Sequence, residues 1–384
     1  MNDTSQKQVR NRPNILLIGS QKSGTTSLAN GLGAHRNIFL PNEKELNFFT
    51  RPKWAEEQDA YYKRFKSNAH TQYWMDATPG YMWTYTKYGR QLGDRSPMQH
   101  NIPAAIHQAL GSDVKIIAIM RHPVRRAVSA FFHQFRMGRL GSGDRIRNMG
   151  HRQGIVDLGF YSEQLAAYRE YFPEDAIKTY FFEIYMAHTE EVHRDLFLWL
   201  GLCPTDVKKT MPETNAGMKL DYSGGGISVR SGMEQIRKLA LHPDYKKMRV
   251  IEPPIVEQAD LDFLNEIYAD ELEVMAQEYE ITQEIWPRRL TVENYNIRPK
   301  ETARFKSKSS DLKKTIRILG QAHKSGLTEL EEVTMLLHNQ EARHTTLLAL
   351  HKRQLADSQQ EVTMLKKQLS AGNSGNVTSD EVPQ

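Results

Sequence analysis

Short apolar runs and amphipathic segments alternate along the first two-thirds of the chain. The mainly apolar runs are Ile15–Ile18, which ends at Gly19, and Val114–Met120, which ends at Arg121. A third strand candidate is Ile177–Phe182, which also contains Lys178 and Thr179. A continuous apolar run of this length, bounded by a turn, is typical of a strand that is buried on both faces of a parallel sheet. We therefore predict buried strands at these three positions.

The segments between these runs carry apolar residues at helical spacing. The predicted helices are Thr25–Leu32, Val124–Gln134, Tyr161–Tyr171 and Glu190–Leu200. Pro123 suits the first turn of the second helix, because a proline there lacks an N–H that would have no partner in any case. Strands that alternate with helices predict an α/β fold, in which helices flank a parallel sheet.

The composition changes after Trp286 and Pro287. Residues 311–369 contain no proline, and an apolar residue recurs every seven positions from Leu348 to Leu369. This spacing leaves two alternatives open: a coiled coil that pairs two chains, or a helix that docks on its own domain. The sequence predicts a tail at 1–12, a P-loop-like α/β domain at 13–287, a polar linker at 288–310, a helical appendage at 311–369 and a disordered tail at 370–384.

The overall composition excludes several classes of protein. The chain has 51 Lys and Arg against 46 Asp and Glu, a net charge of +5, which suits an anionic ligand but is far below that of a nucleic-acid-binding domain. No apolar run is long enough to span a membrane, and Met1–Asn14 lacks the apolar core of a secretory signal. Cys203 is the only cysteine, so an internal disulfide is excluded. These features predict a cytoplasmic protein.

A loop rich in Gly, Ser and Thr, Gly19–Thr26, lies between the first predicted strand and the first predicted helix. Small residues let the backbone fold around an anion, and the start of a helix directs its N–H groups at that anion. The lysine lies two residues before Gly24, unlike the lysine of the GxxxxGK[ST] loop of nucleotide hydrolases. We expect a phosphate-binding loop, with an unliganded turn as the alternative. The predicted binding residues are Gln21, Lys22, Ser23, Gly24, Thr25 and Thr26.

The second apolar run ends at a cation. In a magnesium-dependent P-loop enzyme such a strand typically ends in an Asp that helps to hold the metal, whereas this one ends in Arg121. Arg121, with the hydroxyl of Ser129 eight residues later, predicts a second anion clamp; a surface ion pair is the alternative for Arg121. Two anion sites without metal carboxylates suit a nucleotide that carries phosphates at both its 5′ and 3′ ends, bound without a metal.

These motifs resemble those of the sulfotransferases that use 3′-phosphoadenosine 5′-phosphosulfate (PAPS). Ile18–Thr26 is similar to the family's 5′-phosphosulfate loop, and Arg121–Ser129 is similar to its 3′-phosphate motif. The resemblance extends from Pro13 to Trp286. Within the family, the sequence Lys-Glu-Leu-Asn-Phe-Phe at 44–49 is similar to a segment of the carbohydrate branch, which includes the heparan sulfate sulfotransferases.

The resemblance implies roles for individual residues. In the carbohydrate branch a Glu of this segment is the catalytic base, so Glu45 inherits that role, and PAPS is the sulfuryl donor. Lys22 would stabilise the negative charge that builds on the departing 5′-phosphate. The implied acceptor is a hydroxyl, or an amine, of a glycan, a glycolipid or a similar molecule. Ala77 departs from the pattern, because several carbohydrate enzymes have Lys there.

Two other functions stay open at this point. One is a nucleotide-dependent P-loop kinase, against which the Arg-terminated strand argues. The other is a catalytically inactive, sulfotransferase-like scaffold, in which the C-terminal helix would carry the function. In any of these proteins, pairing of the C-terminal helix would give a homo-oligomer. The Arg-rich stretch Phe131–Gly154, with five Arg and one acidic residue, would either contact an anionic glycan or form a solvated loop.

Overall fold

The computed structural model describes residues 11–43, 45–84, 86–91, 101–207, 220–222, 225–229 and 253–297. The chain divides into two compact units, residues 1–306 and 307–384, and all of the described residues lie in the first unit. The predicted helical appendage at 311–369 and the predicted tail at 370–384 therefore lie outside the described residues.

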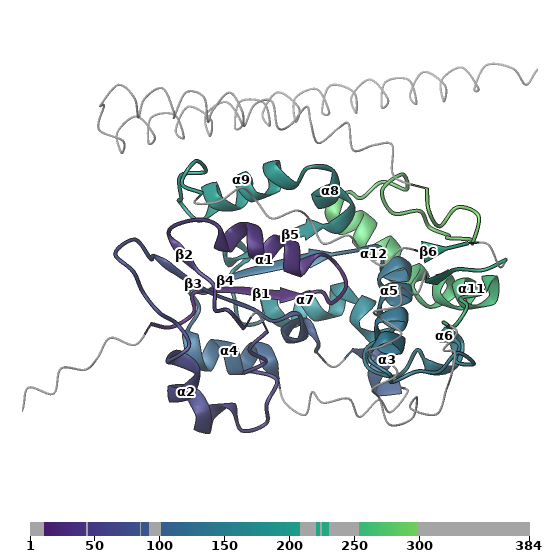
Figure 1. Cartoon of the computed structure of the whole chain (residues 1–384), viewed down its shortest axis with the longest axis horizontal. Coiled ribbons are helices and arrows are strands. Elements are labelled where there is room, and N and C mark those ends of the chain that lie inside the picture. Colours follow the sequence, from purple (N-terminus) through teal and green to yellow (C-terminus); the bar gives the residue numbers. More distant parts are fainter. Residues whose placement is uncertain are drawn as a thin grey trace, which may run out of the picture. The chain divides into compact units, whose positions relative to one another are not determined.

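A five-stranded sheet forms the centre of the first unit (Figure 1). Its strand order is β2-β3-β1-β4-β5, and each neighbouring pair is parallel. The strands are β1 (Ile15–Gly19), β2 (Ile38–Phe39), β3 (Tyr73–Ala77), β4 (Lys115–Met120) and β5 (Ile177–Phe181). A separate antiparallel pair is formed by β6 (Leu220–Asp221) and β7 (Ser228–Val229). The three predicted strands are confirmed as β1, β4 and β5, whereas the two-residue β2 and the Asp76-containing β3 were not predicted.

Helices lie on both faces of this sheet, as predicted (Figure 1). The α-helices are α1 (Thr25–Gly33), α2 (Gln58–Tyr62), α3 (Lys87–Gln91), α4 (Ile102–Leu110), α5 (Pro123–Arg136), α6 (Ile146–Met149), α7 (Tyr161–Arg169), α8 (Phe182–Ala187), α9 (Thr189–Trp199), α11 (Gln258–Ile267) and α12 (Ala269–Tyr279). Short 3-10 helices are η1 (Trp54–Glu57), η2 (Pro79–Met82), η3 (Asp157–Gly159) and η4 (Glu174–Ala176). The four predicted helices correspond to α1, α5, α7 and α9. Within the described part of the chain, no helix is both long and apolar enough to cross a membrane.

Alternate side chains of β1 enter two separate apolar cores. Leu16 and Ile18 pack in the core that includes residues of α4, α5 and α7, and Ile15 and Leu17 pack in the core that includes residues of α1 and α9. All four side chains are fully buried, and burial of one such side chain stabilises a fold by about 1.5–3 kcal/mol. Because β1 is held from both faces, the loop that begins at Ser20 starts from a rigid strand.

The packed domain extends past residue 287, where the sequence predicts its boundary. Leu290 and Tyr295 are buried. The amide side chain of Asn265, on α11, bonds the backbone of Leu290 at both its carbonyl and its N–H, over 2.8 and 2.9 Å. Residues 288–297 therefore pack on the domain, and the part of the predicted linker that the structure describes is not a linker.

Candidate active site

The carboxyl ends of four parallel strands meet at one edge of the sheet. β1 leads into the predicted phosphate loop, β4 leads into Arg121, β3 is followed by Thr78, and β5 is followed by Phe182. Ligands of open α/β sheets bind outside this edge. The sheet topology therefore brings the sequence-predicted anion-binding residues to the place where such folds bind ligands.

The loop Ser20–Gly24 folds tightly between β1 and α1. Lys22 and Gly24 have φ angles of 70° and 89°, in the left-handed region. Gly24 is required there, because a Cβ atom would lie 2.9 Å from the ring of Phe182. The hydroxyls of Ser20 and Ser23 hydrogen-bond each other over 2.6 Å. Gly24 precedes α1 without a side-chain cap, so the first-turn N–H groups of α1 suit an external anion.

Arg121 is held against this loop. Its Nη1 donates to the carbonyl oxygen of Lys22 over 3.2 Å, and its guanidinium lies over the ring of Phe182, 4.8 Å from the ring centroid. The hydroxyl of Tyr161 donates to the carbonyl oxygen of Arg121 over 2.6 Å and fixes the turn. The Nε atom of Arg121 is buried and finds no hydrogen-bond acceptor among the described residues. These contacts do not fit the alternative of a surface ion pair.

Ser129 lies on the accessible face of α5. Between Pro123 and Phe135, every residue of this helix is buried except Ser129 and His133, which are half-buried and one turn apart. Burial, with a smaller contribution from the positive charge of Lys22, lowers the pKa of His133 to about 4. The charge of Lys22 therefore acts on the accessible face of α5 that also carries Ser129.

The segment with Glu45 lies beside β3 rather than in the phosphate loop. Glu45 is exposed, and two residues later the backbone N–H of Asn47 donates to the hydroxyl of Thr78 over 3.3 Å. Thr78 leads into η2, which packs against β1: a Cβ atom on Gly19 would lie 2.6 Å from the Cβ atom of Met82. Since β1 continues into the phosphate loop, the Glu45 segment and the loop are attached to neighbouring strands.

A buried carboxylate, Asp76, lies beneath this segment. It accepts hydrogen bonds from the hydroxyls of Tyr61, Thr78 and Tyr81 over 2.8, 2.7 and 2.7 Å. The pKa of Asp76 is raised to about 6, because the effect of complete burial outweighs that of the three hydroxyl donors, and the charge of Glu45 contributes to the rise. Glu45 and Asp76 are therefore close enough to interact electrostatically.

Sequence reasoning missed three residues that shape this edge: Asp76, Tyr161 and Phe182. Asp76 is the penultimate residue of β3, and its place two residues before Thr78-Pro79 was a usable signal. Phe182 lies directly after the carboxyl end of β5, and the carboxyl ends of parallel strands are where such sheets bind ligands. Tyr161 begins α7, and nothing local in the sequence distinguishes its hydroxyl from that of any other buried tyrosine.

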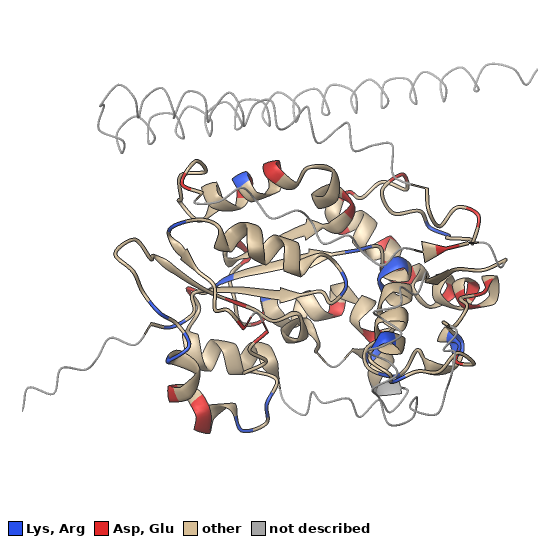
Figure 2. Cartoon of the chain, viewed as in Figure 1, with Lys and Arg blue, Asp and Glu red and all other residues tan. Residues whose placement is uncertain are grey.

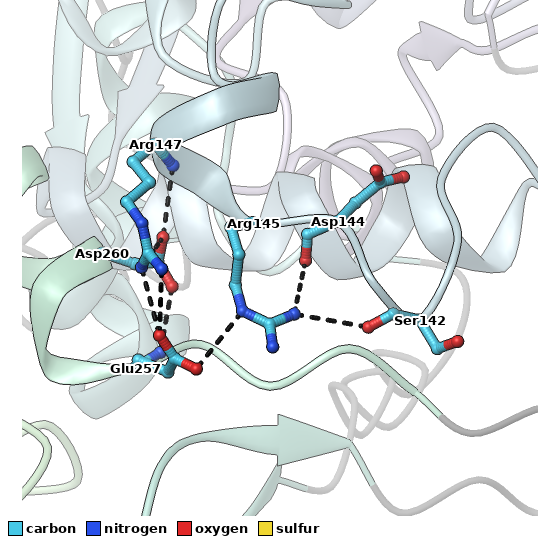
Figure 3. A network of polar contacts seen from close by, with 6 residues as sticks. All are labelled: Ser142, Asp144, Arg145, Arg147, Glu257 and Asp260. Carbon is cyan, nitrogen blue, oxygen red and sulfur yellow. Dashed lines mark hydrogen bonds and ion pairs between the residues drawn. The ribbon is translucent and has the colours of Figure 1, made fainter.

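Two arginines of the Arg-rich stretch Phe131–Gly154 pair with acidic residues. Figure 2 shows acidic residues on α11 beside basic residues on α6. Arg147 contacts Glu257 and Asp260 over 3.1 and 3.2 Å, and Arg145 contacts Glu257 over 3.3 Å (Figure 3). These two arginines therefore join α6 to the start of α11.

Comparison with known proteins agrees with this arrangement of motifs. Residues 13–206 match the sulfotransferase family, and this region is just over half of the 384-residue chain. The chain belongs to the sulfotransferase family. The match includes both anion-binding motifs and the Glu45 segment, so the family resemblance of the sequence is confirmed.

Individual relatives of this sulfotransferase are distant. A human heparan sulfate glucosamine 3-O-sulfotransferase 6 is 26% identical over 174 residues, which are 43% of this chain and 45% of that enzyme. The chain thus aligns with less than half of the length of this relative. A sulfotransferase from Alicyclobacillus acidocaldarius is similar over 67% of this chain and 96% of its own, with a TM-score of 0.43 and 21% identity. The sulfotransferase domain of the curacin biosynthetic pathway is similar over 78% and 98%, with a TM-score of 0.36 and 15% identity.

Proposed function

We propose that this sulfotransferase moves a sulfuryl group in line from PAPS to a hydroxyl or amine of a glycan, glycolipid or similar acceptor, with Glu45 as the general base. The observation that carries the proposal is the contact between Arg121 and Lys22, which joins two anion-binding motifs that lie 99 residues apart in the sequence. A nucleotide with phosphates at its 5′ and 3′ ends would engage both motifs.

The residues at the sheet edge fit such a donor. Arg121 has a buried Nε atom that finds no acceptor in the part of the chain that the structure describes, and the left-handed backbone at Lys22 and Gly24 precedes an uncapped helix start. Each of these features suits a phosphate oxygen. When bound, PAPS would supply the activated sulfuryl group and a phosphate leaving group.

Each residue of the proposed site has a separate task. Lys22 and the first N–H groups of α1 would stabilise negative charge at the 5′-phosphate. Arg121 and Ser129 would hold the 3′-phosphate and favour PAPS over ATP. Glu45 would accept the proton of the acceptor, a contribution typically of about 10²- to 10⁴-fold. Sulfuryl groups carry less charge than phosphoryl groups, so we expect no metal requirement.

A glycan acceptor is supported by the name of the human relative, a heparan sulfate glucosamine 3-O-sulfotransferase. The Lys-Glu-Leu-Asn-Phe-Phe segment at 44–49 supports the same branch of the family. We also propose a cytoplasmic location, supported by the single cysteine, Cys203, which is exposed and unpaired with any other cysteine.

The donor is tested by calorimetry with 3′,5′-adenosine bisphosphate and with ATP, each in chelator and with Mg²⁺. We expect tight binding of the bisphosphate without metal and at least tenfold weaker binding of ATP. Binding of ATP only with Mg²⁺, and no binding of the bisphosphate, would contradict the proposal and favour a kinase. Binding of the bisphosphate without sulfuryl transfer to any acceptor in a glycan panel would favour an inactive scaffold.

The base is tested by Glu45→Gln, with Glu43→Gln as the matched control. Glu43 lies two residues earlier and pairs with Arg64. We expect Glu45→Gln to lower kcat by about 100-fold or more and to leave the affinity for the bisphosphate unchanged, whereas Glu43→Gln keeps full activity. Unchanged turnover in Glu45→Gln would remove Glu45 from the role of base.

A further inference from the structure

We propose that Asp76 positions the segment that carries the catalytic base: its carboxylate orients the hydroxyls of Thr78 and Tyr81, which in turn hold the backbone of residues 45–50. Asp76 is in this sense a positioning residue. The inference rests on the proposed role of Glu45, and it adds a group that acts on Glu45 without contacting the acceptor.

Two relays run from Asp76 to the segment. On one side, the Thr78 hydroxyl donates to Oδ1 of Asp76 over 2.7 Å and accepts from the Asn47 N–H over 3.3 Å. On the other side, the Tyr81 hydroxyl donates to Oδ2 over 2.7 Å and accepts from the Phe48 N–H over 3.0 Å. A hydroxyl has one proton and two lone pairs. Because each proton is directed at Asp76, the lone pairs are left for the two N–H groups.

The charge of Asp76 makes this orientation strong. The carboxylate is fully buried, and a buried charge is costly unless hydrogen bonds compensate it. Hydrogen bonds to an ionised acceptor are roughly twice as strong as neutral ones. An apolar residue at position 76 would avoid the free-energy cost of burying a charge. The buried carboxylate is therefore best explained by the hydroxyls of Thr78 and Tyr81 that it orients.

The relayed contacts reach Glu45 through a local turn. Asn47 has a φ of 50°, in the left-handed region that Asn tolerates better than most residues. The Nδ2 atom of Asn47 donates to the carbonyl oxygen of Glu45 over 3.1 Å. The Oγ1 atom of Thr50 donates to the carbonyl oxygen of Asn47 over 2.8 Å. A backbone held at residues 47 and 48 therefore also restrains Glu45.

Tyr61 provides a matched control. Its hydroxyl donates to the same Oδ2 atom of Asp76 over 2.8 Å, and its ring stacks on Phe48 with centroids 3.9 Å apart. Within the described residues, however, its hydroxyl accepts no N–H from residues 45–50. Tyr61→Phe and Tyr81→Phe thus remove the same kind of hydrogen bond to Asp76. Only Tyr81→Phe also removes a hydrogen bond to the backbone of Phe48.

The first test is hydrogen exchange of the free protein, read at the amides of Asn47 and Phe48. We expect Tyr81→Phe to accelerate exchange at Phe48 by about three- to tenfold, Asp76→Asn to accelerate both amides, and Tyr61→Phe to leave both within twofold. Equal acceleration in Tyr61→Phe and Tyr81→Phe, or none in Asp76→Asn, would overturn the proposal. This readout needs no activity, so it stands even if Glu45 proves not to be the base.

The second test separates kcat from KM. Asp76→Asn and Tyr81→Phe should lower kcat by about 10- to 100-fold, as misplacement of a catalytic group does, and leave the KM for PAPS and the affinity for 3′,5′-adenosine bisphosphate within twofold. Tyr61→Phe should keep kcat. If Asp76→Asn does not fold, comparison of kcat between Tyr61→Phe and Tyr81→Phe tests the proposal without it. Faster exchange at Phe48 with an unchanged kcat in Tyr81→Phe would refute the catalytic part of the proposal.

Discussion

The guanidinium of Arg121 donates a hydrogen bond to the backbone carbonyl of Lys22 over 3.2 Å. The register of β1 and β4 places Gly19 opposite Ala118, so the two loops leave adjacent strands at the same level. Arg121, directly after β4, is thereby held against the backbone of the predicted phosphate loop that follows β1.

Replacement of Arg121 tests the 3′-phosphate site. We expect Arg121→Ala to weaken binding of 3′,5′-adenosine bisphosphate by about 1.5–3 kcal/mol, or about 10- to 150-fold, because a charged anchor is lost. Calorimetry measures the affinity. Arg169→Ala is the control, because Arg169 pairs with Glu174 and Glu278; it should keep the affinity of the unmodified protein. An unaltered affinity in Arg121→Ala would refute the role in 3′-phosphate binding.

The ring of Phe182 supports both anion-binding motifs, since it contacts the guanidinium of Arg121 and excludes a side chain at position 24. We expect Phe182→Leu to weaken bisphosphate binding by about 0.5–1 kcal/mol, or two- to fivefold, through loss of the cation–π contact. Phe181→Leu is the matched control, because Phe181 precedes it in β5 and packs on Trp286. A larger loss of affinity in Phe181→Leu than in Phe182→Leu would contradict this role.

Asp76 gives the protein an unusual dependence of stability on pH. Its pKa is about 6 in the folded protein against an ordinary value of 3.8, so the folded state binds the proton more tightly than the unfolded state does. The ionised carboxylate therefore destabilises the fold above about pH 6, and this cost disappears as the pH falls toward 4. The two values differ by about 2, which corresponds to roughly 3 kcal/mol.

Urea unfolding of the unmodified protein and of Asp76→Asn measures this effect. The difference between their free energies of unfolding should shift in favour of the unmodified protein by up to roughly 3 kcal/mol between pH 7 and pH 4. Taking the difference cancels the titration of all other groups. A difference that stays constant over this range would show that Asp76 has an ordinary pKa.

In the contact between α6 and α11, we expect the buried Asp260 to contribute more to the free energy of unfolding than the more exposed Glu257. Asp260 is fully buried and accepts from the backbone N–H groups of Arg147 and Glu257 over 3.2 and 3.0 Å. Asp260→Ala should lower the free energy of unfolding by about 1–3 kcal/mol, because two N–H groups lose their acceptor. Glu257→Gln should have a smaller effect that vanishes at high salt. Chemical denaturation at two salt concentrations checks both, and equal losses would refute this ranking.

Local sequence patterns predicted the strand–loop–helix units well. The strands β1, β4 and β5 and the helices α1, α5, α7 and α9 follow from local patterning and turn residues, which act within a few positions. Strand β3 was not predicted, and the buried charge of Asp76 lies within it. The partners of Arg145 and Arg147 could not be predicted from local sequence either, because Glu257 and Asp260 lie about 110 residues away.

The sequence by itself determined the residues of the phosphate loop, the Arg-terminated strand and the family, because each is a property of neighbouring positions. Only the tertiary structure decided that Arg121 contacts Lys22, that Phe182 lies beneath both motifs, and that Asp76 is buried under the Glu45 segment. Contacts of this kind depend on strand order and on packing between distant segments. A buried carboxylate such as Asp76 acquires its altered pKa and its hydroxyl partners only when the surrounding elements exclude water.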